Sequence, residues 1–142
     1  MRWQPPQIDP LPDFGAAELT VVPVSGNAPE DVVVDAHGRI WTGVDDGRIV
    51  RISPAGDTTV VGRTTGRPLG LAVAADGRLL ICTSPGGLFA MAPDTGAVQP
   101  LVEQVDGRPL RFCSNVTEMP DGTIYFTEST SAFSYAHFKG AV

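Results

Sequence analysis

Short runs of β-branched and aromatic residues, separated by tight turns, make up most of this chain. The run Val32 to Val34 leads into the turn His37-Gly38, and a second apolar run begins at Ile40. Such turns predict hairpins, because glycine adopts positive φ without a steric penalty. No longer stretch carries the i, i+3, i+4, i+7 stripe of an amphipathic helix, and 13 prolines and 16 glycines also disfavour helices. The pattern predicts an all-β protein.

The chain repeats this pattern three times. The glycine of the central turn is Gly38 in the first copy, Gly77 in the second and Gly122 in the third, giving spacings of 39 and 45 residues. Four short antiparallel strands in roughly 40 residues are typical of a β-propeller blade. The predicted repeats span residues near 29–63, 68–103 and 113–142.

The flanking segments predict a simple organisation. Residues 1–18 are rich in proline and are predicted to be an extended lead-in, so that the partial propeller spans 19–142. Residues 19–24 are predicted to form a strand that would complete the last blade of a closed ring. The loops that lead into the second and third repeats share the sequence Gly-Arg-Pro-Leu, at 66–69 and 107–110. An insertion at 111–114 is predicted to explain the longer second spacing.

Three repeats are too few to close a ring of the usual four to eight blades, and the third repeat lacks its last strands. We therefore expect an incomplete ring, with about two and a half to three blades. This would be a fragment of a longer propeller, a truncated gene product, or a piece that needs another chain to cover it. Open sheet edges invite pairing, so self-association through these edges is expected.

Composition excludes several classes of partner. The net charge of −6 and the pI of about 4.7 argue against a nucleic-acid surface, which needs clustered Lys and Arg. No apolar run approaches the roughly 18 residues of a membrane span. The first residues lack the hydrophobic core of a signal peptide, so a cytoplasmic location is expected. Cys82 and Cys113 are predicted to be reduced, buried thiols.

Four passages of the chain resemble a known family. They are residues 29–43, 66–71, 108–115 and 121–129, in that order. Together they are similar to the gluconolactonase, senescence-marker-protein and strictosidine-synthase-like superfamily of six-bladed propellers, and most closely to its bacterial strictosidine-synthase-like members. The resemblance extends over about residues 20–138 and corresponds to a little under half of a full family member.

The resemblance implies a metal site at the mouth of the central channel. Active members hold a divalent ion, usually calcium, with a Glu at the start of the first inner strand and Asn or Asp from later blades. Carboxylate and amide oxygens suit such an ion, which can polarise a lactone or ester carbonyl and activate water. The resemblance therefore makes Glu30 and Asn115 the candidate metal ligands. By register, Ser114 matches Glu30 and Asn115 lies one step beyond, and the remaining ligands and acid/base residues would lie in later blades.

Plainer interpretations compete with these roles. Glu30 would otherwise be a solvated carboxylate at the start of a strand, and Asn115 a polar residue that satisfies nearby backbone. Asp45-Asp46 is interpreted as an exposed hairpin turn rather than a cation site. Trp41, Tyr125 and Phe126 are interpreted as blade-packing residues rather than a ligand cage, since they lie on strands beside the apolar positions of the repeat.

These observations lead to one main hypothesis and one alternative. The chain is predicted to be the N-terminal portion of a metal-dependent lactonase- or esterase-like propeller hydrolase that acts on a small lactone or ester. On its own it is predicted to be inactive. A strictosidine-type condensation is disfavoured, because that chemistry depends on a later glutamate that this chain lacks. The alternative is a non-catalytic propeller fragment that serves packing or protein interaction.

Overall fold

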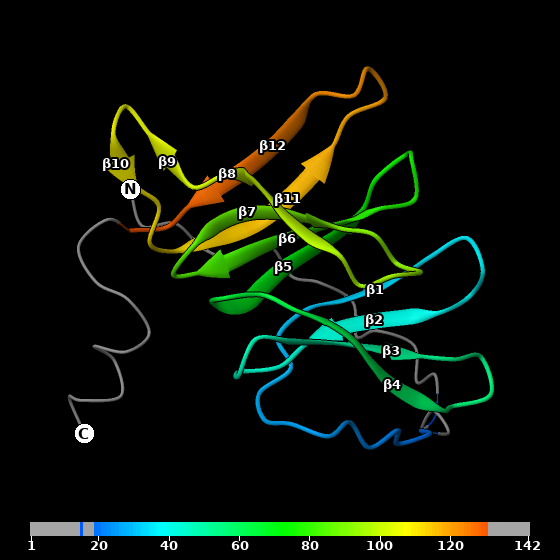
Figure 1. Cartoon of the computed structure of the whole chain (residues 1–142). Helices are drawn as coiled ribbons and strands as arrows, with labels where there is room; N and C mark the ends of the chain where they lie inside the picture. The colour runs from blue at the N-terminus through cyan, green and yellow to red at the C-terminus, as the bar shows by residue number, and fades with distance from the viewer. Residues whose placement is uncertain (1–14, 16–18, 131–142) are drawn as a thin grey trace, which may run out of the picture.

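All regular secondary structure in the described part of the chain is β. The computed structural model describes residue 15 and residues 19–130, and it contains strands β1 to β12 (Figure 1). Among these residues there is no helix long and apolar enough to cross a membrane. The strands form two four-stranded antiparallel sheets and two hairpins. The predicted all-β, partial propeller is therefore confirmed.

The first blade follows the predicted pattern of strands and turns. It is a meander with the order β1-β2-β3-β4. Gly38 and Gly47 have φ of +72° and +93°, as expected for the hairpin glycines. The strands are β1 (Val32–Val34), β2 (Ile40–Gly43), β3 (Arg48–Ile52) and β4 (Thr58–Arg63).

The second blade repeats the first and is more completely buried. Its order is β5-β6-β7-β8, and every residue of β6 and β7 is buried. Gly77 and Gly87 supply positive φ in its turns. The strands are β5 (Arg67–Val73), β6 (Leu79–Ser84), β7 (Gly87–Met91) and β8 (Val98–Val102).

The third blade is represented by a single hairpin in the described part. Strand β11 (Cys113–Glu118) pairs with β12 (Ile124–Glu128) around the Gly122 turn. A smaller hairpin of β9 (Gln104–Val105) and β10 (Arg108–Pro109) precedes it. The rest of the predicted third repeat, from residue 131 onward, lies outside the described residues.

The predicted strand at residues 19–24 is wrong. The structure assigns no strand there, and Leu19 and Val21 are 85% and 86% exposed. A strand requires a neighbouring strand to satisfy its backbone, and no described strand lies in register with this segment. Apart from Gly15, the predicted lead-in 1–18 lies outside the described residues.

The two Gly-Arg-Pro-Leu sequences occupy different structures. Arg67 and Pro68 begin β5 and pair with β6, whereas Arg108 and Pro109 form β10 beside β9. The spacing of 45 residues places Phe112, rather than Arg108, level with Arg67. The extra length of the second spacing therefore lies in the β9–β10 hairpin and the loop that follows it. The predicted insertion at 111–114 coincides with this loop only at residues 111 and 112, because β11 begins at Cys113.

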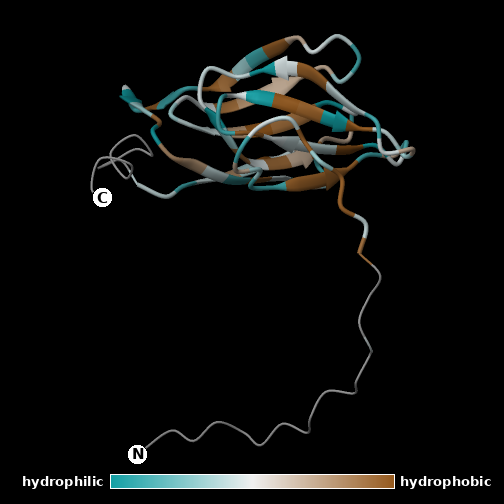
Figure 2. Cartoon of the chain, turned by 90° about the horizontal axis from the view of Figure 1, so that it is seen from below, coloured by the Kyte–Doolittle hydropathy of each residue, from teal (hydrophilic) through white to brown (hydrophobic). Residues whose placement is uncertain are grey.

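Two apolar layers hold the blades together, and Figure 2 shows brown, apolar segments along the stacked strands. The first layer lies between the first and second blades, and the second lies between the second and third blades. Burial of this much apolar surface is the main stabilising contribution to the fold. The first layer consists of Trp41, Ile49, Leu71, Leu79, Ile81, Phe89 and Met91. The second consists of Ala74, Leu80, Cys82, Leu88, Ala90, Leu110 and Cys113.

Candidate functional site

The inner strands of the three blades begin side by side. Strand β5 lies against β1 on one side and against β11 on the other. Asp31, just before β1, accepts a hydrogen bond on Oδ2 from the backbone N–H of Leu71 at 2.8 Å. Gly70 abuts the backbone of Ser114 and Asn115 so closely that a Cβ there would collide with the Ser114 carbonyl oxygen. The starts of the three inner strands are therefore in register, at Asp31, Gly70 and Asn115.

Glu30 lies at the start of the first inner strand, where the resemblance predicts a metal ligand, and it forms an ion pair. Its Oε2 atom is 2.9 Å from Nη2 of Arg67, which begins β5. The same Arg67 nitrogen donates to the carbonyl oxygen of Ala28 at 3.2 Å. The Glu30 side chain is 41% exposed and that of Arg67 is 13% exposed. The carboxylate thus faces solvent on one side and a fixed guanidinium on the other.

Asn115 lies in β11 of the third blade. Its backbone is held on both sides, because its N–H donates to Oγ1 of Thr127 at 3.1 Å and its carbonyl accepts from Sγ of Cys82 at 3.4 Å. The residue itself is exposed and helps to line a shallow groove of about 310 Å³. The groove is lined by Asn115, Val116, Thr117, Tyr125, Phe126 and Thr127.

The described residues do not form a site for the predicted metal ion by themselves. Among residues 15 and 19–130 there is no cluster of three or more His, Cys, Asp or Glu side chains able to hold one. Glu30 already has a cationic partner in Arg67, and a calcium ion requires six to eight oxygen ligands. The metal-binding roles of Glu30 and Asn115 therefore remain predictions.

Glu128 organises the start of the third blade, a role that was not predicted. One of its carboxylate oxygens, Oε1, accepts from the backbone N–H of Arg111 at 2.9 Å and of Phe112 at 3.1 Å. Beside it, the hydroxyls of Ser114 and Ser129 are 2.5 Å apart. These contacts hold the loop before β11 against the end of β12. The only signal in the sequence is an acidic residue at a strand end, which is too common to predict this role.

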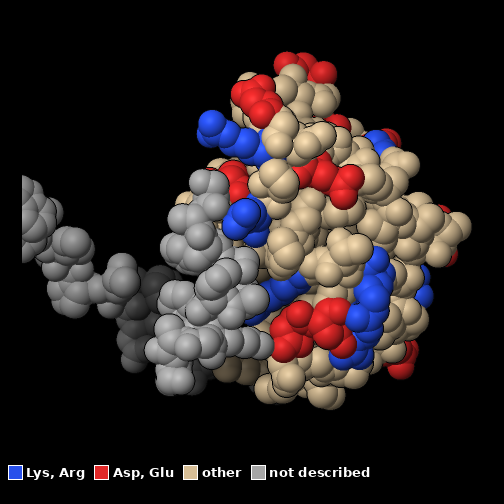
Figure 3. All heavy atoms as spheres, turned by 60° about the vertical axis from the view of Figure 1, so that its left-hand side comes forward, with Lys and Arg blue, Asp and Glu red and all other residues tan. Residues whose placement is uncertain are grey.

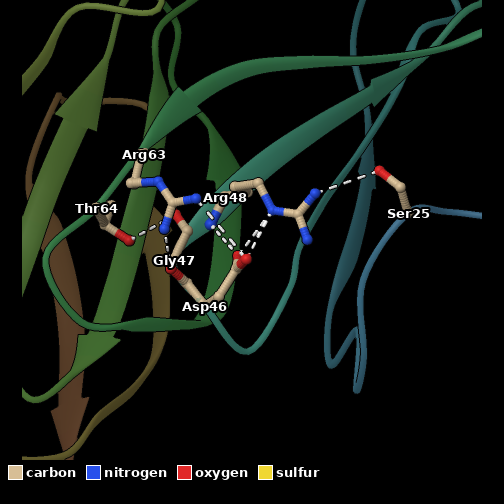
Figure 4. A network of polar contacts seen from close by, with 6 residues as sticks. All are labelled: Ser25, Asp46, Gly47, Arg48, Arg63 and Thr64. Atoms are coloured by element: carbon tan, nitrogen blue, oxygen red, sulfur yellow. Dashed lines mark hydrogen bonds and ion pairs between the residues drawn. The ribbon is translucent and has the colours of Figure 1, made fainter.

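The turn between β2 and β3 contains Asp46, which lies at the centre of a network of polar contacts (Figure 4). Its carboxylate accepts from Nε of Arg48 at 2.8 and 2.9 Å, and the hydrogen bond from Arg48 lowers the pKa of Asp46. Arg63 donates to the Asp46 carbonyl at 2.5 Å, and Arg48 also reaches Oγ of Ser25 at 3.4 Å. The carboxylate is thus engaged by arginines, which agrees with a structural hairpin turn.

Acidic and basic side chains also lie close together elsewhere in the first two blades. On the face shown in Figure 3, Asp and Glu are interspersed with Lys and Arg rather than gathered into one large patch. Two of the closest pairs are Arg39 with Asp35 at 2.6 Å and Arg78 with Asp76 at 2.7 Å. Both pairs flank the turn between the first two strands of a blade, so they stabilise hairpins.

Cys82 and Cys113 are both fully buried between the second and third blades and carry free thiols. The Sγ of Cys113 also lies 3.5 Å from Oε2 of Glu128. Contact with Cys82, together with burial and the nearby carboxylate, raises the pKa of the Cys113 thiol far above its usual range. Both cysteines are therefore buried core residues with free thiols, as the sequence predicted.

Comparison with known proteins identifies relatives of this chain. Residues 15–52 match the family model described as strictosidine synthase-like, N-terminal. The protein strictosidine synthase-like 4 of Arabidopsis thaliana is 30% identical over 118 residues, which cover 79% of this chain and 32% of that protein. The adipocyte plasma membrane-associated protein of Gallus gallus is 32% identical over 127 residues, covering 78% of this chain and 30% of that protein.

Solved structures show the same blades. A gluconolactonase from Xanthomonas campestris superposes with a TM-score of 0.58 at 25% identity, covering 66% of this chain and 32% of that chain. A virginiamycin B lyase from Staphylococcus aureus superposes with a TM-score of 0.61 at 17% identity, covering 75% of this chain and 36% of that one, and supports the fold alone. The chain spans about a third of the length of the first curated relatives. By its sequence matches and its stacked blades, the chain belongs to the strictosidine synthase-like family of the six-bladed propeller superfamily.

Proposed function

We propose that this chain is the N-terminal portion of a lactonase- or esterase-like propeller hydrolase and is inactive by itself. The observation that supports the proposal is that Asp31, Gly70 and Asn115 lie in register, which brings the starts of the three inner strands side by side. Likeness to a gluconolactonase, at 25% identity, supports hydrolysis of a cyclic ester as the chemistry.

The proposed substrate is a small lactone or ester, and the proposed cofactor of the whole protein is a divalent ion, with calcium as the prediction. Glu30 and Asn115 would each offer one oxygen ligand, from the first and third blades. All other ligands and the acid/base residues would come from later blades. Arg67 would hold the Glu30 carboxylate in place until those blades complete the site.

A non-catalytic propeller is the second candidate, and the Glu30–Arg67 ion pair favours it. A guanidinium 2.9 Å from the carboxylate already balances its charge without an ion. In that case the blades would serve packing or protein interaction, and no lactone would be turned over.

The test is hydrolysis of gluconolactone and p-nitrophenyl acetate by the protein expressed from the complete gene, with calcium and with EDTA. We expect turnover that EDTA removes, and we expect Glu30→Gln to lower kcat/KM by about a hundredfold or more. Glu103→Gln, at an exposed position after β8, is the matched control and should keep full activity. Absence of turnover in a folded protein, or turnover that neither EDTA nor Glu30→Gln affects, would support the second candidate.

A further inference from the structure

Two cysteines meet across the layer between the second and third blades. Cys82 lies in β6 and Cys113 begins β11, and both are fully buried in the second apolar layer. The Cys82 thiol donates to the carbonyl oxygen of Asn115, two residues beyond Cys113, at 3.4 Å. The two thiols also contact each other directly. Because the sequence contains no other cysteine, the fold brings its only two thiols together from different blades.

The strands that carry the two thiols pack closely. Cα atoms of β6 and β11 lie within 8 Å of each other. On the neighbouring strand β5, Gly70 permits this approach, since a Cβ there would collide with the carbonyl oxygen of Ser114. A disulfide depends on such an approach, because its two Cα atoms are usually about 4–7 Å apart. The two sulfur atoms therefore meet while both blades keep their packing.

The closed layer protects these thiols from oxidants. Neither cysteine has exposed surface. The Sγ of Cys113 is 3.5 Å from Oε2 of Glu128, and a neighbouring carboxylate disfavours the thiolate, which is the reactive form. Backbone N–H groups of Arg111 and Phe112 hold Glu128 in this place. Oxidation therefore requires the second and third blades to separate, and their separation exposes both thiols together.

We propose that Cys82 and Cys113 are a redox-sensitive pair, which a low-molecular-weight disulfide such as oxidised glutathione converts to a disulfide between the two blades when the blades open. One cysteine thiolate attacks a glutathione sulfur, the S–S bond of the oxidised glutathione breaks, and one glutathione leaves. The other cysteine thiolate then attacks the mixed disulfide and releases the second glutathione. The two cysteines lose two electrons to the oxidised glutathione, and their two protons end on two reduced glutathione molecules.

The disulfide would hold the start of the third inner strand against the second blade. Asn115 follows Cys113 by two residues, and its carbonyl already accepts from Cys82. Once the blades close on the bond, they would separate again only after its reduction or at a higher concentration of denaturant. The proposal rests on the cysteine pair alone and holds whether or not the protein is a hydrolase.

The experiment measures how strongly the fold favours the disulfide. The 142-residue chain is equilibrated with mixtures of reduced and oxidised glutathione, in native buffer and in urea, starting from both the oxidised and the reduced chain. Acid quenching, alkylation and intact mass spectrometry then count the chains that carry the disulfide. We expect the effective concentration of one thiol at the other to be about tenfold or more higher in native buffer than in urea, because only the folded chain holds the pair together.

A relocated cysteine provides the matched control. Cys113→Ala combined with Thr117→Cys keeps two cysteines but moves one to an exposed position on the same strand, so its effective concentration should be similar in both solvents. Circular dichroism checks that the variant keeps its β structure. Equal values for the wild-type chain in native buffer and in urea would overturn the proposal. An oxidised chain that unfolds at less urea than the reduced chain would also overturn it, since the folded blades would not accommodate the bond.

Discussion

The carboxylate of Asp31 accepts a hydrogen bond from the backbone N–H of Leu71 across two blades, at a distance of 2.8 Å. The residues are 40 positions apart in the chain, so this bond joins the inner strand of one repeat to that of the next. Asp31 also accepts from the backbone N–H of Val32 on its other oxygen. The Asp31 carboxylate therefore fixes the position of β1 along the neighbouring strand β5.

Replacing Asp31 should weaken the contact between the first two blades. Asp31→Ala leaves the partly buried N–H of Leu71 without its partner, and we expect the free energy of unfolding to fall by about 1–3 kcal/mol. Asp31→Asn keeps an accepting oxygen and should cost less. Urea unfolding measures both variants, and equal stability of Asp31→Ala and the wild type would contradict the proposed role.

The turn of the first blade should make stability depend on pH. Burial acts to raise the pKa of Asp35, but hydrogen bonds from Trp41, Arg39 and His37 outweigh it and lower the pKa from 3.8 to about 2. Because the pKa is lower in the folded state, this contribution is present above pH 3.8 and is lost as the pH falls toward 2. Its size is about 2 kcal/mol near neutral pH.

Asp35→Asn should remove this pH-dependent contribution. We expect the variant to be less stable than the wild type at pH 7, and the difference to shrink between pH 4 and pH 2. Urea midpoints measured across this range test the expectation. Asp94→Asn, at a side chain that is 86% exposed, is the control and should follow the wild type. A constant difference between Asp35→Asn and the wild type at all pH values would contradict the assignment.

Alanine substitutions at two glycines distinguish the energetic cost of backbone strain from that of a steric clash. Gly56 and Gly96 both have positive φ, +91° and +71°. A Cβ at Gly56 would meet nothing, whereas a Cβ at Gly96 would collide with the carbonyl oxygen of Val61. We expect Gly56→Ala to cost about 1–2 kcal/mol from strain alone, and Gly96→Ala to cost clearly more. Thermal unfolding compares the two variants, and equal losses would mean that the close approach to Val61 is absent.

The buried thiols should be unreactive in the folded chain. Both cysteines are fully buried, and the raised pKa of Cys113 keeps its thiol protonated, whereas the thiolate is the reactive form. We expect the disulfide reagent DTNB to react with neither cysteine in native buffer and with both in urea. Fast reaction of the native chain would show that the layer between the second and third blades opens.

The repeat could be predicted from the sequence because its signals are local. Gly38, Gly77 and Gly122 all adopt the positive φ that their hairpin turns require. The strand at residues 19–24 could not be predicted correctly, since an apolar run becomes a strand only when a partner lies beside it. Likewise the same Gly-Arg-Pro-Leu letters begin β5 at one place and lie in the β9–β10 hairpin at another.

The candidate site was less predictable than the fold. The position of Glu30 just before the first inner strand agrees with the sequence, but its pairing with Arg67 does not appear in any local pattern. The two residues are 37 positions apart and meet only because the first two blades stack. The hydrogen bonds that Glu128 accepts from the loop before β11 likewise depend on how β12 pairs with β11.

A calcium titration of the 142-residue chain by calorimetry tests most directly the claim that these blades hold only part of a metal site. We expect no saturable binding with a dissociation constant below about 1 mM, because Glu30 is paired with Arg67 and too few oxygen ligands are at hand. The Glu30→Gln chain should give the same flat titration. Saturable binding of one ion per chain that Glu30→Gln abolishes would contradict the claim and show that the blades form a complete site.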